Sequence, residues 1–102
     1  MPTSEVTFHR LAAREYRAAR DWYRQRSVET AERFCFAVDR AASRIASDID
    51  ALPTLTGAYR YARVNRFPYV LIFRQTAPGV VMVVAVAHTS RRPGYWRGRR
   101  EL

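Results

Sequence analysis

The chain has 102 residues, of which 48% are apolar and 26% are charged, so it is long enough for one domain and too apolar for global disorder. A single cysteine excludes an internal disulfide, and the longest apolar run, from Val80 to Ala87, is far too short to span a bilayer. Because no basic and then apolar leader opens the sequence, we expect a cytoplasmic protein with one domain over residues 1–102.

The charge is strongly positive and unevenly distributed. The chain carries 18 arginines, no lysine and 9 acidic residues, which gives a net charge of +9. Residues 1–52 hold 9 arginines and 8 acids, whereas residues 53–102 hold 9 arginines and one acid, Glu101. A genome rich in G and C explains the choice of arginine over lysine, but it does not explain the missing acids after Pro53. We therefore expect the second half of the chain to face a nucleic acid, an acidic protein or a membrane surface.

The apolar pattern predicts a strand followed by two helices. Residues 3–8 alternate as in a short strand, and in residues 10–26 the apolar positions recur at steps of three and four, as on a helix. A second helix continues this period to Leu52, where Pro53 ends it, and Ser27 is its candidate N-cap. Its apolar stripe is Ala31, Phe34, Val38, Ala41, Ile45, Ile49 and Leu52. Two amphipathic helices with a short connection favour an antiparallel hairpin.

The period then changes to that of strands. After a loop over residues 53–57, residues 59–66 alternate, and residues 67–73 are rich in β-branched and aromatic side chains. Residues 80–87 are apolar on both faces, as in a central strand, and a turn at 77–79 precedes them. We expect an α+β domain in which a helical hairpin packs on a four-stranded antiparallel sheet, in the order β-α-α-β-β-β. A basic C-terminal tail or a short helix completes it.

The segment from His88 to Arg100 combines arginines with aromatic residues. Its arginines are Arg91, Arg92, Arg97, Arg99 and Arg100. Arginine binds phosphate in a bidentate manner and aromatic faces stack on bases, so the segment is typical of a nucleic-acid groove. Tyr, Trp and Arg also dominate protein–protein hot spots, and a solvated basic tail is a third interpretation.

RNA cleavage without a metal requires a base, an acid and cations on the phosphate. The candidate residues for such a reaction are His88, Arg91 and Tyr95. The candidates for binding a target or a nucleic acid are Arg63, Arg66, Arg91, Arg92, Tyr95, Trp96 and Arg97. The sequence contains no glycine-rich phosphate loop and no Cys/His set with metal-ligand spacing, so we expect neither a metal site nor a cofactor.

Two further residues have a simpler interpretation. Cys35 lies between two phenylalanines in the second predicted helix and is expected to be buried as a small apolar side chain. His9 lies between the first strand and the first helix, where we expect it to cap the helix or to lie on the surface.

Five segments, spread over nearly the whole chain, resemble a known superfamily. They are Ala18–Tyr23, Ala31–Phe34, Arg66–Phe73, Val84–His88 and Arg91–Trp96. Together they resemble the RelE/ParE superfamily, the toxins of type II toxin–antitoxin systems, also described as plasmid stabilisation proteins. The resemblance implies a small growth-inhibiting toxin that a separate acidic antitoxin neutralises. The predicted order of strands and helices also matches the fold of this superfamily.

The superfamily has two main activities. RelE-like members cut mRNA in the ribosomal A site, whereas ParE-like members poison DNA gyrase and are not nucleases. The nuclease branch has an arginine after the tyrosine of the third strand, where this chain has Val70 after Tyr69, and Thr89 stands near the place of a further arginine. The resemblance therefore favours DNA gyrase as the target. Ribosome-bound mRNA is the alternative target, for which His88 supplies the histidine that some ribosome-dependent relatives use.

Overall fold

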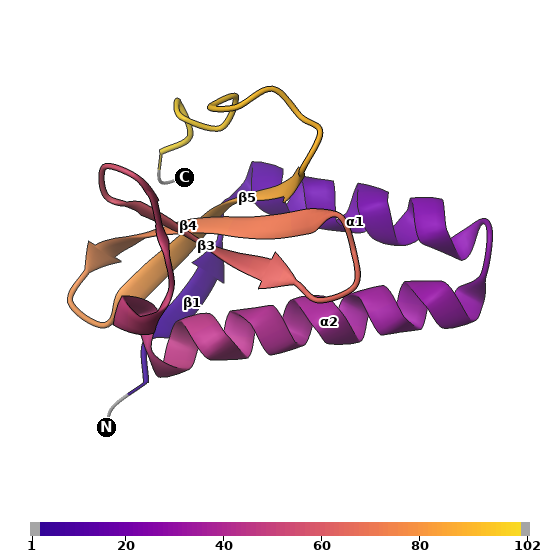
Figure 1. Cartoon of the computed structure of the whole chain (residues 1–102), viewed down its shortest axis with the longest axis horizontal. Helices are drawn as coiled ribbons and strands as arrows, with labels where there is room; N and C mark the ends of the chain where they lie inside the picture. Colours follow the sequence, from indigo (N-terminus) through magenta and orange to yellow (C-terminus); the bar gives the residue numbers. More distant parts are fainter. Residues whose placement is uncertain (1–2, 101–102) are drawn as a thin grey trace.

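In the computed structural model, which describes residues 3–100, two helices pack on one face of a five-stranded sheet (Figure 1). The helices are α1 (Arg10–Arg24) and α2 (Val28–Ser47), and a short 3-10 helix, η1 (Ile49–Ala51), follows α2. The strands are β1 (Glu5–Phe8), β2 (Thr54–Thr56), β3 (Tyr59–Val64), β4 (Tyr69–Ala77) and β5 (Val80–His88). In the sheet they lie in the order β1-β5-β4-β3-β2.

Both helices begin at a side-chain cap. Nδ1 of His9 accepts a hydrogen bond from the backbone N–H of Leu11 at 3.0 Å, and the hydroxyl of Ser27 accepts one from the backbone N–H of Thr30 at 3.2 Å. Each cap satisfies a backbone donor that the first helical turn leaves without a partner. The predicted capping roles of Ser27 and His9 are therefore confirmed. Cys35, which was expected to be buried, is only partly buried.

The core between the helices and the sheet is centred on Phe34, which is fully buried. The rings of Tyr16, Tyr23, Phe67 and Tyr69 surround it at centroid separations of 5.2–5.9 Å. Most of these pairs meet edge to face or tilted, as aromatic quadrupoles favour. The apolar stripe that the sequence predicts on α2 therefore faces this core as far as Ile45.

The second helix is shorter than its apolar pattern predicts. It ends at Ser47 instead of Leu52, because Asp48 adopts an extended φ of −161° and the chain continues as η1. Ile49 and Leu52 still pack against the core from this position. The apolar spacing is thus kept while the backbone changes, which is why periodicity alone placed the end of the helix too late.

The prediction of a four-stranded antiparallel sheet is wrong in two respects. First, β1 pairs with β5 in parallel, from Glu5 opposite Val80 to Phe8 opposite Val83, so the sheet is mixed. The two helices carry the chain away from β1 before the next strand, so no short turn sets the direction of β1 relative to its neighbour. Second, residues 54–56, predicted as part of a loop, form β2 by pairing with β3.

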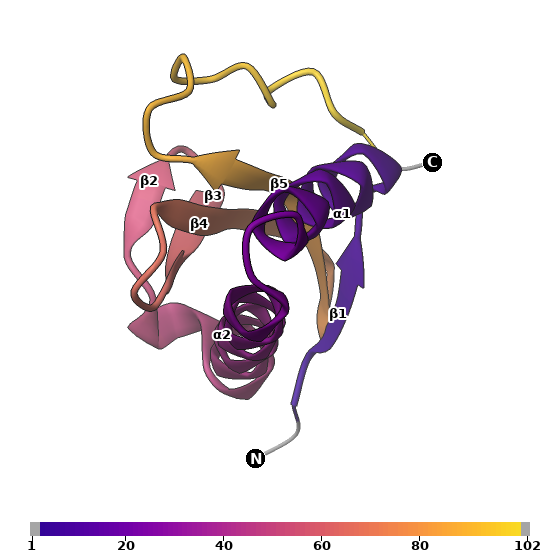
Figure 2. The same cartoon turned by 90° about the vertical axis from the view of Figure 1, so that its right-hand side faces the viewer.

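The sheet is covered on both faces. The helices cover one face, and the segment from Thr89 to Arg100, called the tail below, runs over the other and returns toward α1 (Figure 2). The tail is a succession of turns without the short helix that was the alternative. Its Trp96 packs in a second apolar cluster with Ile72, Met82, Val84, Ala85 and Ala87. This arrangement confirms the prediction that residues 80–87 form a strand covered on both faces.

A β-bulge in β5 changes which of its residues face the helices. Ile72 pairs with Ala85 and Phe73 pairs with Val83, so Val84 has no opposite residue in the β4–β5 ladder. Such an extra residue reverses the alternation of side chains beyond it. Beyond the bulge the ladder with β4 resumes, from Ala85 opposite Ile72 to His88 opposite Tyr69.

Candidate functional site

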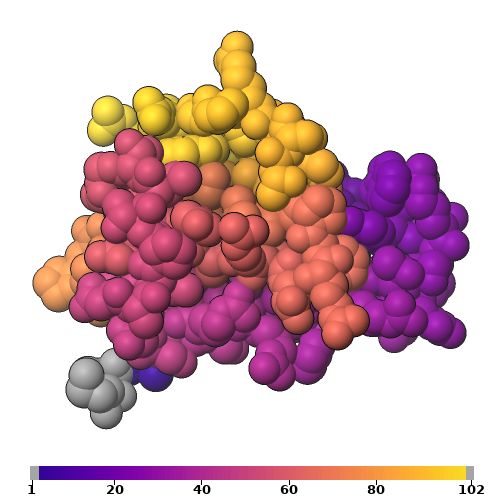
Figure 3. Space-filling model, in the orientation of Figure 1, coloured from indigo at the N-terminus to yellow at the C-terminus, as the bar shows by residue number. Residues whose placement is uncertain are grey.

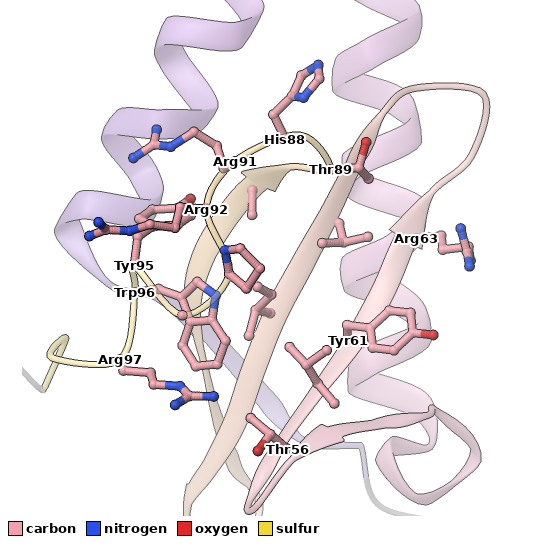
Figure 4. A pocket seen from close by; sticks show the side chains of 16 residues that line it. Thr56, Tyr61, Arg63, His88, Thr89, Arg91, Arg92, Tyr95, Trp96 and Arg97 are labelled. Atoms are coloured by element: carbon pink, nitrogen blue, oxygen red, sulfur yellow. The ribbon is translucent and has the colours of Figure 1, made fainter.

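Most of the predicted site residues gather along one groove between the tail and the sheet (Figure 4). This tail groove has a volume of about 400 Å³, and its apolar part is formed by residues of β2, β3, β4 and β5 together with the tail. The predicted residues that line it are Arg63, His88, Arg91, Arg92, Tyr95, Trp96 and Arg97. Figure 4 shows His88 at one end of the groove, Arg97 at the other and Arg63 on the opposite wall.

Arg66 is the one predicted binding residue that does not line the tail groove. It lies in the turn between β3 and β4, with a left-handed φ of 71°. This turn directs it to a separate hollow beside α2, which it shares with Arg33, Arg40 and Arg44. Arg63 borders both hollows. The sequence placed Arg66 next to β3 but could not show which way the turn directs it.

Trp96 is a buried part of the structure and not a free aromatic face. Only 3% of it is exposed, and its indole meets the ring of Tyr59 edge to face with centroids 4.5 Å apart. In the space-filling view the tail, in yellow and orange, rests directly on the sheet (Figure 3). Because its ring fills the space between the tail and the sheet, Trp96 offers no open aromatic face in this structure, and its predicted role in binding a target stays a prediction.

The hydroxyl of Tyr95 is engaged by a carboxylate on α1. It donates a hydrogen bond to Oε2 of Glu15 at 2.8 Å. Burial, and then the hydrogen bond to Glu15, raises the pKa of the Tyr95 phenol far above its ordinary value. The phenol is therefore firmly protonated at neutral pH, and its proton points toward α1.

Arg99 joins the same cluster through a bidentate ion pair. Its Nη1 donates to Oε1 of Glu15 at 2.8 Å and its Nη2 donates to Oε2 at 3.0 Å. Nη1 also donates to the carbonyl of Val84 at 3.0 Å, and Oε1 of Glu15 accepts from the backbone N–H of Val86 at 3.0 Å. β1 pairs with β5 only as far as Val83. Beyond the end of β1, Glu15 and Arg99 therefore supply hydrogen bonds to backbone groups at the edge of β5.

His88 is oriented by its neighbours at the end of β5. Its Nδ1 accepts from the backbone N–H of Ser90 at 3.0 Å, and the Ser90 hydroxyl lies 2.7 Å from the same nitrogen. The ring of Tyr69 meets the imidazole edge to face at 5.1 Å. Because Nδ1 is an acceptor here, the neutral ring carries its proton on Nε2 and presents a donor to other molecules.

The remaining arginines of the tail groove carry uncompensated charge. Arg63, Arg91, Arg92 and Arg97 are exposed, and within residues 3–100 none of them has a carboxylate oxygen within 4 Å. The guanidinium of Arg91 lies 4.0 Å from the centre of the Tyr95 ring, which holds it in place by a cation–π contact. A groove with several cations and no nearby anion attracts an anionic surface over a distance of about 10 Å.

A comparison with known protein families identifies the chain. Residues 6–93 match the family described as ParE toxin of type II toxin-antitoxin system, parDE. The chain belongs to this family. It is thus the toxin of a type II toxin–antitoxin system and has a cognate antitoxin as its partner. No curated protein matches it in sequence. The expected membership of the RelE/ParE superfamily is confirmed, and the match ends at Pro93, before Tyr95, Trp96 and Arg99.

Sequence reasoning missed Glu15, the residue of this ParE toxin that binds both Tyr95 and Arg99 of the tail. A signal for it was present, because Glu15 lies three residues after Ala12 and four before Ala19, both of which are buried. An acid on the buried stripe of a helix requires a partner. The partner, Arg99, lies 84 residues further along the chain, so no local pattern identifies the pair.

The described residues of the ParE toxin contain neither a metal-binding cluster nor a membrane-spanning helix. Among residues 3–100 no three His, Cys, Asp or Glu side chains come together as a group able to hold a metal ion. In the same part of the chain, neither helix combines the length and the apolar character needed to cross a membrane.

Proposed function

We propose that this ParE toxin stops growth by binding DNA gyrase and that it does not cleave RNA. The observation that carries this proposal is the hydrogen bond between Tyr95 and Glu15. A nuclease would need the Tyr95 phenol to exchange a proton with the substrate, but the phenol donates to a carboxylate on α1 and has a raised pKa. The residue that would complete an acid–base pair is thus committed to a structural contact.

The state of His88 supports the same conclusion. A general base must offer a nitrogen without a proton, and in the neutral ring that nitrogen is Nδ1, which already accepts from Ser90. Nε2 then carries the proton and acts as a donor. His88 is therefore better suited to bind an acceptor on a partner than to remove a proton from a ribose hydroxyl.

The tail groove supplies what a protein-binding toxin needs. Its apolar floor, which includes Val70 and Ile72, is bordered by the exposed guanidinium groups of Arg63, Arg92 and Arg97. Arginine around an apolar centre is typical of binding hot spots. Within residues 3–100 no carboxylate lies within 4 Å of these arginines, which favours fast and salt-sensitive association with an acidic surface. We infer that these arginines contact gyrase in the cytoplasm, where we expect the toxin to act.

The antitoxin is proposed to be acidic and to cover apolar surface as well as arginines. Val28 and Phe36 on α2 are 60% and 63% exposed, and Phe36 shares a hollow with Arg33, Arg40 and Arg44. A partner that buries these side chains gains apolar contact which salt does not screen. We expect the purified complex to remain associated in moderate salt, and its complete dissociation there would contradict the apolar contribution.

The decisive experiment measures both activities on the same protein. We expect the purified toxin to inhibit supercoiling by gyrase and to trap a cleavage complex, and RNA sequencing after induction to show no codon-specific cuts. Arg92→Gln combined with Arg97→Gln should weaken the inhibition of gyrase, whereas Arg17→Gln combined with Arg24→Gln, on the exposed side of α1, should leave it unchanged. Unaffected supercoiling and no trapped complex would reject gyrase as the target.

The alternative is a ribosome-dependent endoribonuclease with His88, Arg91 and Tyr95 in its site. One observation favours it: these three residues line the same groove. In that case induced cells would show cuts at preferred codons, and His88→Ala or Tyr95→Phe would abolish toxicity while the protein remains folded. Intact mRNA in growth-arrested cells would exclude this alternative.

A further inference from the structure

We propose that Glu15 is a positioning residue that holds the tail against the sheet, so that the tail arginines border the groove. The proposal rests on the proposed function of that groove in binding the target. Glu15 lies on α1, between the buried Ala12 and Ala19, and does not line the tail groove itself. It acts on the groove through the residues that its carboxylate holds.

Both oxygens of the carboxylate are used. Oε1 accepts from the backbone N–H of Val86 and from Arg99, and Oε2 accepts from Arg99 and from the hydroxyl of Tyr95. These contacts connect α1, β5 and two points of the tail at a single side chain. A planar carboxylate facing a guanidinium fork is the geometry that gives the strongest and most specific ion pairs.

The Glu15–Arg99 ion pair is largely shielded from solvent, so each of its charges depends on the other for compensation. The side chains of Arg99 and Glu15 are 13% and 17% exposed, whereas the carboxylates of the other ion pairs within residues 3–100 are 54–88% exposed. Removing one member of a shielded pair leaves the other charge without compensation. It also leaves the backbone groups of Val84 and Val86 without the partners that replace a neighbouring strand.

The contacts of Glu15 with Arg99 and Tyr95, called the clamp below, fix the far end of the tail segment that carries the arginines of the groove. At the near end the tail is attached to the sheet, since Thr89 N–H donates to the carbonyl of Pro68 at 2.9 Å. Between this point and Arg99, the indole of Trp96 is the other buried attachment. The segment between Thr89 and Arg99 carries Arg91, Arg92 and Arg97. If the contact between Arg99 and Glu15 is lost, we expect these arginines to become mobile.

Tryptophan fluorescence tests the clamp without any knowledge of the target. The chain has two tryptophans, and Trp22, at 52% exposure on α1, can be replaced by phenylalanine to leave Trp96 as the reporter. In this background we expect Glu15→Gln to shift the Trp96 emission to longer wavelength and to increase its quenching by acrylamide. Far-UV circular dichroism should show that the helices remain intact. Asp50→Asn is the matched control, because its carboxylate is 88% exposed and pairs with Arg60 at 3.8 Å.

Growth inhibition by the induced variants tests the consequence for function. We expect Glu15→Gln and Arg99→Gln each to raise the expression level needed for half inhibition about tenfold, the factor that corresponds to one lost charge-assisted hydrogen bond. The double variant should be no weaker than either single variant, because both break the same clamp. Tyr95→Phe, which keeps the ion pair, should have a smaller effect.

Two outcomes would overturn the proposal. One is an unchanged Trp96 emission and quenching in Glu15→Gln, and the other is a released tail with undiminished growth inhibition. The Trp96 fluorescence does not involve the target, and growth inhibition responds to any target, so a toxin that fails to inhibit gyrase rejects the proposed target and leaves the role of Glu15 to be decided by these measurements. If Glu15→Gln loses its helices, Arg99→Gln serves as the test, since it breaks the pair from the tail without changing α1.

Discussion

The ring of Tyr59 on β3 meets the indole of Trp96 in the tail edge to face, with centroids 4.5 Å apart. This contact belongs to the face of the sheet that the helices do not cover. It means that the tail of this ParE toxin forms part of a second apolar core. The arginines on either side of Trp96 therefore project from a segment that has a fixed place in the fold.

The first prediction concerns the contribution of this second core to stability. We expect Trp96→Ala to lower the free energy of unfolding by about 3–5 kcal/mol, because it removes a large buried ring and leaves a cavity. Trp22→Ala is the control, and its effect should stay below about 1 kcal/mol because Trp22 is half-exposed and packs only against Arg26 and the edge of Tyr23 among the cation–π and aromatic contacts of residues 3–100. Urea denaturation of both variants measures the difference, and equal losses would contradict the structural role of Trp96.

The second prediction separates protein binding from RNA cleavage. His88→Ala removes an imidazole that hydrogen-bonds Ser90 and meets the ring of Tyr69 edge to face. Because the imidazole lies at the end of β5 and is not buried, we expect the variant to fold and to keep most of its toxicity. Tyr95→Phe loses one hydrogen bond, which corresponds to about 1 kcal/mol, and should remain toxic as well. Growth curves after induction provide the measurement. A complete loss of toxicity in both folded variants would support the nuclease instead.

The third prediction uses the backbone of Arg66, which adopts a left-handed φ of 71°. Arg66→Gly and Arg66→Asn replace it with residues that tolerate this conformation at lower cost. We expect each to raise the free energy of unfolding by up to about 1 kcal/mol. Because Arg66 lies outside the tail groove, inhibition of gyrase should be unchanged. A strong loss of inhibition in both variants would show that the target reaches the second hollow.

The fourth prediction concerns alkaline pH. Burial raises the pKa values of Tyr16, Tyr23, Tyr69 and Tyr95 in the folded protein above their ordinary value of 10.0. A group with a raised pKa in the folded state contributes its full stability below its unfolded pKa and loses it as the pH rises through the folded value. We expect the free energy of unfolding to fall above about pH 10, and to fall less steeply in Tyr95→Phe. Denaturation series at increasing pH test this, and parallel slopes for the two proteins would contradict it.

The sequence predicted the parts of this ParE toxin that depend on local patterns. The helices followed from the spacing of apolar residues around Phe34, and the buried strand followed from the apolar run that contains Val83. Capping by Ser27 was also readable, because the cap and its partner are three residues apart. Six of the seven predicted binding residues and the three candidate nuclease residues line the tail groove, because most of them lie within one short segment.

The sequence did not predict the parts that depend on distant pairing. The parallel arrangement of β1 and β5 joins Glu5 to Val80. With three residues, β2 is too short for its pattern to identify a strand, and it pairs only with β3 among residues 3–100. The bulge at Val84 depends on how β4 and β5 align and not on any one residue. The Glu15–Arg99 pair likewise joins residues from the two ends of the chain. Such contacts are specified by the packed fold and leave only weak local signals.

The parallel pairing of β1 with β5 also determines when, during synthesis, the toxin can finish folding. β1 can pair only after residues 80–83 have been synthesised. Glu15 likewise binds partners that lie 71, 80 and 84 residues further along the chain. Contacts between such distant residues close last, because the chain must first lose the entropy of the intervening loop. A chain still being synthesised therefore lacks both the edge of its sheet and the anchor of its tail. We therefore expect the binding groove to form only once residues 80–99 can fold against β1 and α1.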